Sequence, residues 1–215
     1  MTGRPLTRRD ALWLTLALAA GVAALCGHAP TADAAAAIGA PAPPFTLVSA
    51  DGRQVSLADF RGRTVVLEWT NHECPFVRKH YGAGAMQKLQ KEARDAGVVW
   101  LTIISSAPGE QGHVTPEEAR RLTVSRGAAP AAVLFDETGR TGRAYGAKTT
   151  PHMYVIGPDG ALLYAGGIDD RPGTDPAELA GARNHVREAL AEIAAGKPVS
   201  VRQSRPYGCA IKYAS

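Results

Sequence analysis

Runs of apolar and β-branched residues alternate with helical patterns along most of this 215-residue chain, and this order constrains the fold more than any other feature. One helical pattern begins at Pro75 and ends at Gly97, with a break expected at the glycines of 82–84, and a short one begins at Thr115. Three predicted buried strands lie before, between and after these helical patterns: RTVVLEWT (63–70), VVWLTIISS (98–106) and AAVLF (131–135). Strands joined through helices run parallel, so we expect an α/β fold.

Hairpins are predicted on both sides of this core. FTLVSADGRQVSL turns at Asp51-Gly52, and HMYVI and LLYAG flank the turn GPDG. A final helix is expected from Asp175-Pro176 to about Ala195, ended by Gly196. The predicted order is β-α-β-α-β followed by β-β-α, which gives an α/β sandwich around a mixed central sheet with an N-terminal β-hairpin.

The first residues have the three-part layout of an export signal. Arginines precede an apolar run from Ala11 to Cys26, and small residues follow. TRRDAL resembles a twin-arginine signal. We predict cleavage after Ala34 and a periplasmic or other extracytoplasmic location, with no stable membrane insertion afterwards. Lipidation at Cys26 is the alternative, although Leu25 fits a lipobox poorly. The predicted segments are a signal peptide at 1–34, a linker at 35–44, a domain at 45–196 and a tail at 197–215.

Composition excludes one class of partner. The hydrophobic fraction of 45% and charged fraction of 20% are typical of a globular protein. The net charge of +4 includes no long Lys/Arg run, so nucleic acid is not an expected partner.

Removal of the signal would leave two cysteines, Cys74 and Cys209, and in an exported protein a pair suggests disulfide chemistry. Cys74 lies between a strand and a helix, where free backbone N–H groups and the helix dipole lower a thiol pKa. Arg78, Lys79 and His80 would add positive charge. A buried, inert cysteine is the alternative.

Two further residues could act with Cys74. Glu68 interrupts the apolar run VVLEWT, where a charge is costly unless the carboxyl group is paired or protonated. It would lie beneath the helix start and exchange a proton with Cys74 through a water, or else be partly exposed and paired with an arginine. Cys209 lies on a tail expected to be flexible from Lys197. It could resolve an intermediate formed on Cys74 or form a permanent cross-link with it.

Metal binding is a weaker possibility. His72, His80 and His152 could form a soft metal site with Cys74, but the spacing contains no second nearby cysteine, so no metal and no cofactor are predicted. A second cluster could bind a cation but is more typical of turns and helix caps; it comprises Asp169, Asp170 and Asp175.

The segments VVLEWTNHECPFV, Thr150-Pro151 and FDETGRTGRAYGAKTTPHMYVIGPDGALLYAGGIDD together resemble the thioredoxin-like superfamily, in its redoxin branch (AhpC/TSA-like and periplasmic thiol–disulfide proteins), over about residues 39–195. The resemblance implies a thioredoxin-like three-layer α/β/α sandwich. It implies that Cys74 is the nucleophile, that Glu68 is the family's buried carboxylate, and that Thr150-Pro151 is a cis-proline that holds the incoming disulfide. Sequence alone favours a trans bond there. Pro75, which stiffens the turn after Cys74, is included with the substrate-binding residues.

The chain departs from two family patterns. Val77 replaces the second cysteine of a Cys-x-x-Cys motif. A peroxiredoxin would have Pro-x-x-x-Thr-x-x-Cys, whereas the matching positions here are Leu67, Asn71 and Cys74. We therefore expect an exported thiol–disulfide oxidoreductase that acts on protein or small-molecule thiols and disulfides with a redox partner protein. The alternatives are a thiol peroxidase with an antioxidant role and a non-catalytic thioredoxin-fold binding module, possibly metal-binding.

Overall fold

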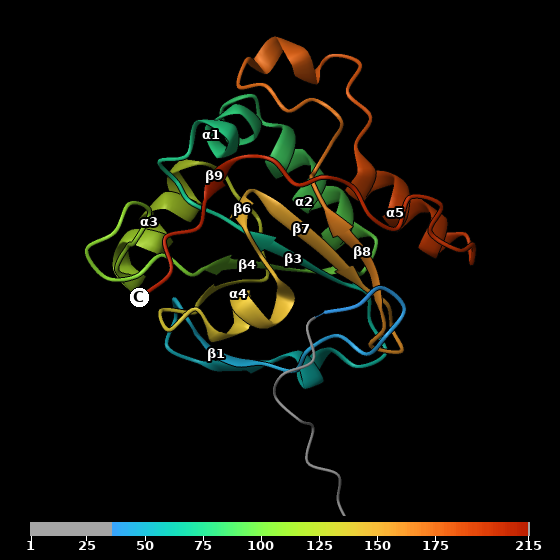
Figure 1. Ribbon diagram of the computed structural model, residues 1–215, viewed down its shortest axis with the longest axis horizontal. Coiled ribbons are helices and arrows are strands. Elements are labelled where there is room, and N and C mark those ends of the chain that lie inside the picture. The colour runs from blue at the N-terminus through green and yellow to red at the C-terminus, as the bar shows by residue number, and fades with distance from the viewer. Residues whose placement is uncertain (1–35, 215) are drawn as a thin grey trace, which may run out of the picture. The chain divides into compact units, whose positions relative to one another are not determined.

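Apolar residues on both faces of the central strands produce a sheet that is covered on both sides. The computed structural model describes residues 36–214, so the predicted signal peptide and its cleavage or lipidation lie outside the described residues. Its main sheet has seven strands in the order β2-β1-β5-β4-β3-β7-β8 (Figure 1). The strands are β1 (Thr46–Ser49), β2 (Gln54–Ser56), β3 (Val65–Trp69), β4 (Val99–Ile104), β5 (Ala132–Phe135), β7 (His152–Ile156) and β8 (Leu162–Gly166).

Strands β3, β4 and β5 are parallel, because helices connect them, whereas β1, β7 and β8 run antiparallel to their neighbours. The predicted mixed sheet and N-terminal hairpin are confirmed by this topology. Alternation along β3 sends Val66 and Leu67 into different hydrophobic clusters, one on each side of the sheet.

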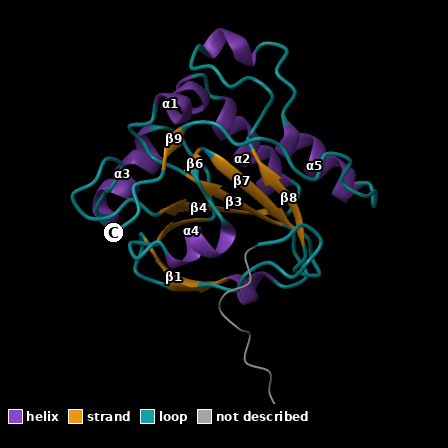
Figure 2. Ribbon diagram, viewed as in Figure 1, coloured by secondary structure: helices purple, strands orange, loops and turns teal. Residues whose placement is uncertain are grey.

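Helices form the two outer layers (Figure 2). The cluster around Val66 includes Val77, Met86 and Val186 from three different helices, and the cluster around Leu67 includes Tyr145 from a fourth. The helices are α1 (Pro75–Gly82), α2 (Ala85–Asp95), α3 (Pro116–Ser125), α4 (Arg140–Tyr145) and α5 (His185–Ala194), with short 3₁₀ turns η1 (Leu57–Phe60) and η2 (Pro176–Leu179). Within the described residues, no helix has the length and apolar character needed to cross a bilayer.

Three sequence-based expectations about helices have different outcomes. The break at the glycines between α1 and α2 is confirmed, with Gly84 left-handed at φ 73°. The single final helix is wrong: Asp175 caps only η2, the chain turns at Gly181, and α5 begins after Asn184, whose side chain accepts from Arg187 N. Helix α4 was not predicted, because it follows Gly139 directly and has no side-chain cap.

The expectation of a flexible tail after Lys197 is also wrong. Strand β9 (Cys209–Ala210) pairs antiparallel with β6 (Thr149–Thr150), and Thr150 is opposite Cys209. Ser204 hydrogen-bonds with Tyr164 before β9, and Tyr213 donates to the Ala147 carbonyl after it. The last segment of the chain therefore follows a defined path across the sheet and helices (Figure 1).

Candidate active site

Cys74 lies where the chain leaves β3 and enters α1. It is the N-cap residue of α1, and Pro75 occupies the first helical position. The Cys74 side chain is fully buried, and its Sγ lies 3.0 Å from the carbonyl oxygen of Thr150, to which the thiol donates. Val77, at the position of the missing second cysteine, is buried in the same hydrophobic cluster as Cys74. The helix start therefore presents a single sulfur atom.

The second sulfur atom comes from the other end of the chain. Both cysteines are free thiols, and the half-buried Cys209 packs against the hydrophobic cluster that contains Cys74. The Thr150–Cys209 register places Cys209 beside the residue that accepts the Cys74 hydrogen bond, and the Cys209 thiol acts on Cys74 to lower its pKa. The structure thus brings together the two cysteines that the sequence analysis selected.

The two thiols differ in acidity. Burial by itself raises the pKa of Cys74, but hydrogen bonds from Cys209, Thr150 and the Val77 backbone outweigh burial, so the net pKa is below the ordinary value. The pKa of Cys209 is raised by burial, by its hydrogen bond to Cys74 and by the Cys74 charge. Cys74 is therefore the thiol that ionises first, with Cys209 as a donor to its thiolate.

The peptide bond between Thr150 and Pro151 is cis, as the resemblance implies and contrary to what sequence alone favours. Thr150 contributes its carbonyl group to Cys74 and pairs with Cys209 through the β6–β9 ladder. Gly208, with φ 130°, lies against this carbonyl group. The backbone around Thr150 therefore positions both thiols.

Glu68 is fully buried and pairs with no arginine among residues 36–214, so the alternative of a partly exposed ion pair is wrong. Its carboxyl group accepts from a ring of donors, and no cysteine is among the described partners. The donors are Trp100 Nε1 (2.8 Å), Tyr81 OH (2.9 Å), Gln90 Nε2 (3.2 Å) and Thr102 Oγ1 (3.2 Å). Burial raises the pKa of Glu68, and the hydrogen bonds only partly oppose that effect.

The positive residues of α1 do not act on Cys74 as expected. Lys79 is buried, donates to the Arg171 carbonyl at 2.5 Å and lies 3.7 Å from a Glu178 carboxylate oxygen. The buried His80 lies 3.1 Å from Tyr207 OH, which in turn donates to Asp169. Burial lowers the pKa of His80 to about 4, so the imidazole is neutral.

Sequence analysis missed this network of Lys79, His80, Asp169 and Tyr207. It holds the tail at Tyr207, two residues before Cys209, and Phe76 of α1 packs on the same tyrosine ring at a centroid distance of 6.0 Å. The proximity of Tyr207 to Cys209 in RPYGC was the one available sequence signal.

The histidines considered for metal binding contact different residues. His152 Nδ1 accepts from Lys148 N and lies 3.2 Å from Tyr154 OH, whereas His80 contacts Tyr207. Within residues 36–214, no group of three or more His, Cys, Asp or Glu side chains is arranged to hold a metal ion. The aspartates cap or close turns: Asp169 accepts from Arg171 N, Asp170 from Arg183 N and Asp175 from Ala177 N.

A parallel β3-β4-β5 core, a cysteine at the start of α1 and a cis-proline beside it define the thioredoxin-like class of fold. The chain belongs to the AhpC/TSA family, whose model matches residues 38–165. This membership supports an oxidoreductase at the general level. The matched region includes Cys74, Glu68 and Pro151 but ends before the tail that carries Cys209. The chain matches no curated protein.

Solved structures agree with this fold. An uncharacterized conserved protein from Geobacillus kaustophilus is 28% identical, with a TM-score of 0.73 over 83% of this chain and 93% of that one. A hypothetical protein from Sinorhizobium meliloti is 26% identical, with a TM-score of 0.72 over 83% and 96%. A proposed protein disulfide isomerase from Bacteroides thetaiotaomicron shares the fold at 21% identity, with a TM-score of 0.54 over 74% and 91%.

Proposed function

We propose that the protein is an exported thiol–disulfide oxidoreductase in which Cys74 is the nucleophile and Cys209 the resolving cysteine. The observation that carries this proposal is that Cys209 pairs with Thr150, whose carbonyl group accepts from Cys74, and the lowered pKa of Cys74 and raised pKa of Cys209 agree with it. An attacking thiol needs a thiolate at working pH, whereas a resolving thiol is needed only after a mixed disulfide has formed.

The chemistry proceeds in two exchanges. The Cys74 thiolate attacks one sulfur of a substrate disulfide, forms a mixed disulfide and expels the other substrate sulfur as a thiolate, which takes up a proton. Cys209 then loses its proton and attacks the Cys74 sulfur, which releases the second substrate thiol and leaves a Cys74–Cys209 disulfide. Two electrons pass to the substrate. A partner dithiol restores the pair by the same exchange in reverse.

The tail controls access in this scheme. Cys74 is fully buried, and β9 occupies the edge of β6 beside the cis-proline, which the family resemblance gives as the docking position for substrate backbone. The tail therefore has to leave β6 before a protein disulfide can pair with Thr150 and reach Cys74. Its return delivers Cys209. Pro75 and Pro151 flank the sulfur and complete the proposed docking surface.

Glu68 is the proposed proton-handling group. Its raised pKa and its position between the sheet and α1 support the role, and its ring of donors means that a proton reaches Cys74 through an intermediary. Export to the periplasm or another extracytoplasmic compartment is supported by the N-terminal pattern, and cell fractionation of the full chain tests it. The proposed domain organisation remains a signal at 1–34, a linker at 35–44, a domain at 45–196 and a tail at 197–215.

Membership of the AhpC/TSA family favours thiol peroxidase activity as a second candidate. In that reaction Cys74 thiolate would attack a hydroperoxide to give a sulfenic acid and an alcohol, and Cys209 would condense with it to a disulfide and water. The residues at the positions that form the peroxide pocket in a peroxiredoxin argue against efficient peroxidase activity. Leu67 is buried in the opposite cluster, and Asn71 is engaged with Gln111 and Glu73.

One experiment separates these functions. Fully reduced protein and its Cys209→Ser variant are mixed with a small excess of oxidised glutathione or of hydrogen peroxide, and intact masses are followed with time. Fast glutathionylation, cleared in the wild type as a Cys74–Cys209 disulfide but persistent in the variant, is the expected result. Rapid peroxide oxidation with a trapped Cys74 sulfenic acid would favour the peroxidase. Absence of reaction with both reagents would contradict both enzymes.

A further inference from the structure

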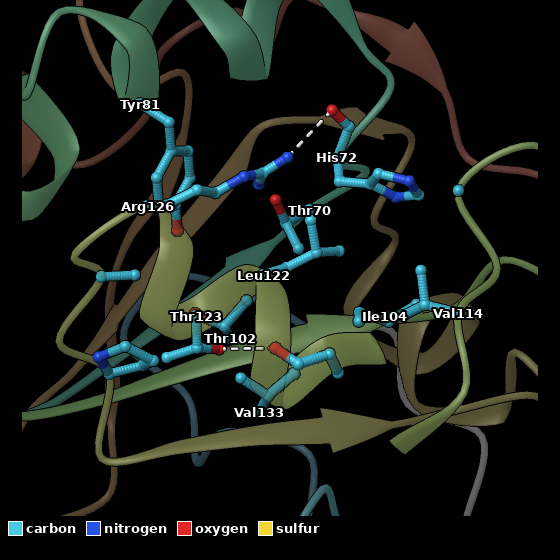
Figure 3. Close-up of a pocket in the computed structure, with 14 residues that line it drawn as sticks. Thr70, His72, Tyr81, Thr102, Ile104, Val114, Leu122, Thr123, Arg126 and Val133 are labelled. Carbon is cyan, nitrogen blue, oxygen red and sulfur yellow. Dashed lines mark hydrogen bonds between the residues drawn. The ribbon is translucent and has the colours of Figure 1, made fainter. Parts of the chain in front are cut away.

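A pocket lies between the sheet and α3, next to the loop that precedes Cys74 (Figure 3). Its cavity volume is about 40 Å³, so a ligand would have to be small and would extend into the open mouth of the pocket. Neither thiol lines it, and neither does Thr150 or Pro151. The pocket therefore lies apart from the two thiols, although Tyr81 and Thr102, which donate to Glu68, line it and His72 at its edge is two residues from Cys74.

One part of the pocket is apolar. Ile104, Val114 and Ala119 are buried there, and Val133 and Leu122 continue the same surface (Figure 3). No acidic side chain from the described residues lines the pocket. Glu68 lies nearby, but its burial raises the pKa, which favours the neutral acid. The Glu73 carboxylate at the edge of the pocket accepts from Gly112 N.

The other part of the pocket carries unsatisfied donors. Arg126 stacks on the Tyr81 ring, with Cζ 5.1 Å from the centroid, and gives one hydrogen bond, from Nη2 to the His72 carbonyl at 3.1 Å. Among the described residues, no carboxylate forms an ion pair with it. Its remaining guanidinium donors are therefore available, and a guanidinium matches a carboxylate in geometry and charge.

Thr70 supplies the second, independent observation. Its side chain is only 8% exposed, and its Oγ1 is buried without a hydrogen-bond partner. Figure 3 shows the Thr70 hydroxyl pointing toward the side of the pocket where the Arg126 guanidinium lies. A buried hydroxyl without a partner is destabilising, so a ligand oxygen at this position would remove a penalty that the free protein carries.

We propose that this pocket binds a small organic carboxylate with a short apolar tail. The carboxylate accepts from the Arg126 guanidinium and from the Thr70 hydroxyl, and the tail packs on Ile104, Val114 and Val133. Apolar surroundings disfavour a fully hydrated inorganic anion, and the unpaired guanidinium disfavours an uncharged or cationic ligand. Because Arg126 also holds the His72 carbonyl, bound carboxylate would stabilise the loop before Cys74.

The test is an NMR titration of ¹⁵N-labelled protein with butyrate, 1-butanol, butylammonium and inorganic phosphate, each at constant ionic strength. We expect butyrate to shift the amide signals of Thr70, His72, Gly112 and Arg126 with saturation, and a Kd of about 1 mM or tighter. The other three probes should bind at least about tenfold more weakly. Equal binding of butanol would show a purely apolar pocket, and equal binding of phosphate a general anion site. Either result, or shifts without saturation, would overturn the proposal.

Single substitutions test which side chains of the pocket contact butyrate. Arg126→Gln should raise the Kd for butyrate at least about tenfold, and Thr70→Val should raise it several-fold. The control is Arg121→Gln, on the exposed side of α3, which should leave the Kd unchanged. If Arg126→Gln fails to fold, Thr70→Val still tests the site, because valine preserves the shape of the threonine side chain and removes only the hydroxyl donor. Unchanged binding in Thr70→Val would contradict the site. Cys74→Ser should bind butyrate normally, so this result is independent of the thiol chemistry.

Discussion

Gly208 lies directly against the carbonyl group of Thr150. A Cβ atom at Gly208 would overlap the Thr150 carbonyl oxygen and carbon, which are backbone atoms that cannot turn aside, and Gly208 also has a positive φ of 130°. A side chain at this position would therefore push β9 away from β6. Since β9 carries Cys209, this contact links the glycine of the GC pair to the geometry of the two thiols.

We expect Gly208→Ala to have opposite effects on the two exchange steps. Attack of Cys74 on oxidised glutathione should become faster, because β9 no longer covers the sulfur, and closure of the Cys74–Cys209 disulfide should slow by about tenfold, equivalent to about 1.4 kcal/mol. Rapid-quench mass spectrometry measures both steps. Gly196→Ala is the matched control, because Gly196 also has a positive φ (66°) but open space around it. Equal changes in both variants would contradict this account.

The Cys209 thiol should lower the Cys74 pKa through its hydrogen bond. Cys209→Ala removes this donor, and since a hydrogen bond to a charged group contributes about 1.5–3 kcal/mol, the Cys74 pKa should rise by about one unit or more. Cys209→Ser keeps a hydroxyl donor at the same position and should restore most of the lowering. The measurement is the pH dependence of iodoacetamide alkylation at Cys74, read from its peptide by mass spectrometry. Identical Cys74 pKa values in the two variants would show that the thiol hydrogen bond is unimportant.

The Tyr207 hydroxyl should keep the tail in place. Tyr207→Phe removes the hydrogen bonds to Asp169 and His80 but keeps the ring contact with Phe76. Because it leaves buried polar groups without a partner, it should lower the free energy of unfolding by about 1–3 kcal/mol and slow closure of the Cys74–Cys209 disulfide. Tyr145→Phe also loses one hydroxyl bond, to the Pro43 carbonyl, but does not contact the tail. It should therefore destabilise the protein without slowing closure, and a similar slowing there would argue against a tail-specific effect.

The sequence predicts the core of this site because its signals are local. The run before Cys74, the proline after it and the alternation of strands and helices all depend on neighbouring residues, and the structure confirms the elements they predict. For Glu68 the local sequence left a buried carboxyl group and a partly exposed ion pair open, and the family resemblance favoured the buried carboxyl group. Its actual donors could not be predicted, because Trp100 and Thr102 reach it only through the β3–β4 register.

The tail is where sequence-based prediction fails. The segment containing Cys209 has weak strand propensity and only two residues in β9, and its order depends on pairing with Thr150 and on the Tyr207 contacts with α1. Both are tertiary interactions between segments far apart in the chain. The roles of Lys79 and His80 in α1 were misassigned for the same reason, because only the fold shows that Lys79 lies beside Glu178 and that the neutral His80 lies beside Asp169.

Glu68 should behave as a neutral acid in the folded protein. If it is protonated at pH 7, Glu68→Gln should change the free energy of unfolding by about 1 kcal/mol or less, since an amide replaces a carboxylic acid of similar shape. Glu68→Leu leaves Trp100 Nε1 and Thr102 Oγ1 without an acceptor and should cost about 3 kcal/mol or more. Urea unfolding measures both. A loss of more than about 3 kcal/mol in Glu68→Gln would indicate an ionised carboxylate. If Glu68 handles the Cys74 proton, Glu68→Gln should also shift the pH profile of alkylation.

His152 should make stability depend on pH. Burial, aided by Lys148, lowers its pKa to about 4, whereas in the unfolded chain it is near 6.5. The unfolded state therefore binds more protons between these values, and stability is lost as the pH falls below 6.5. Compared with His152→Asn, whose side-chain oxygen can accept from Lys148 N, the wild type should lose about 2 kcal/mol between pH 7 and pH 5. Because the variant retains every other ionisable group, including His80 and Glu68, their contributions cancel in the difference. If the difference in the free energy of unfolding between the two proteins stays constant over this pH range, His152 has the same pKa in the folded and unfolded states, and the prediction is wrong.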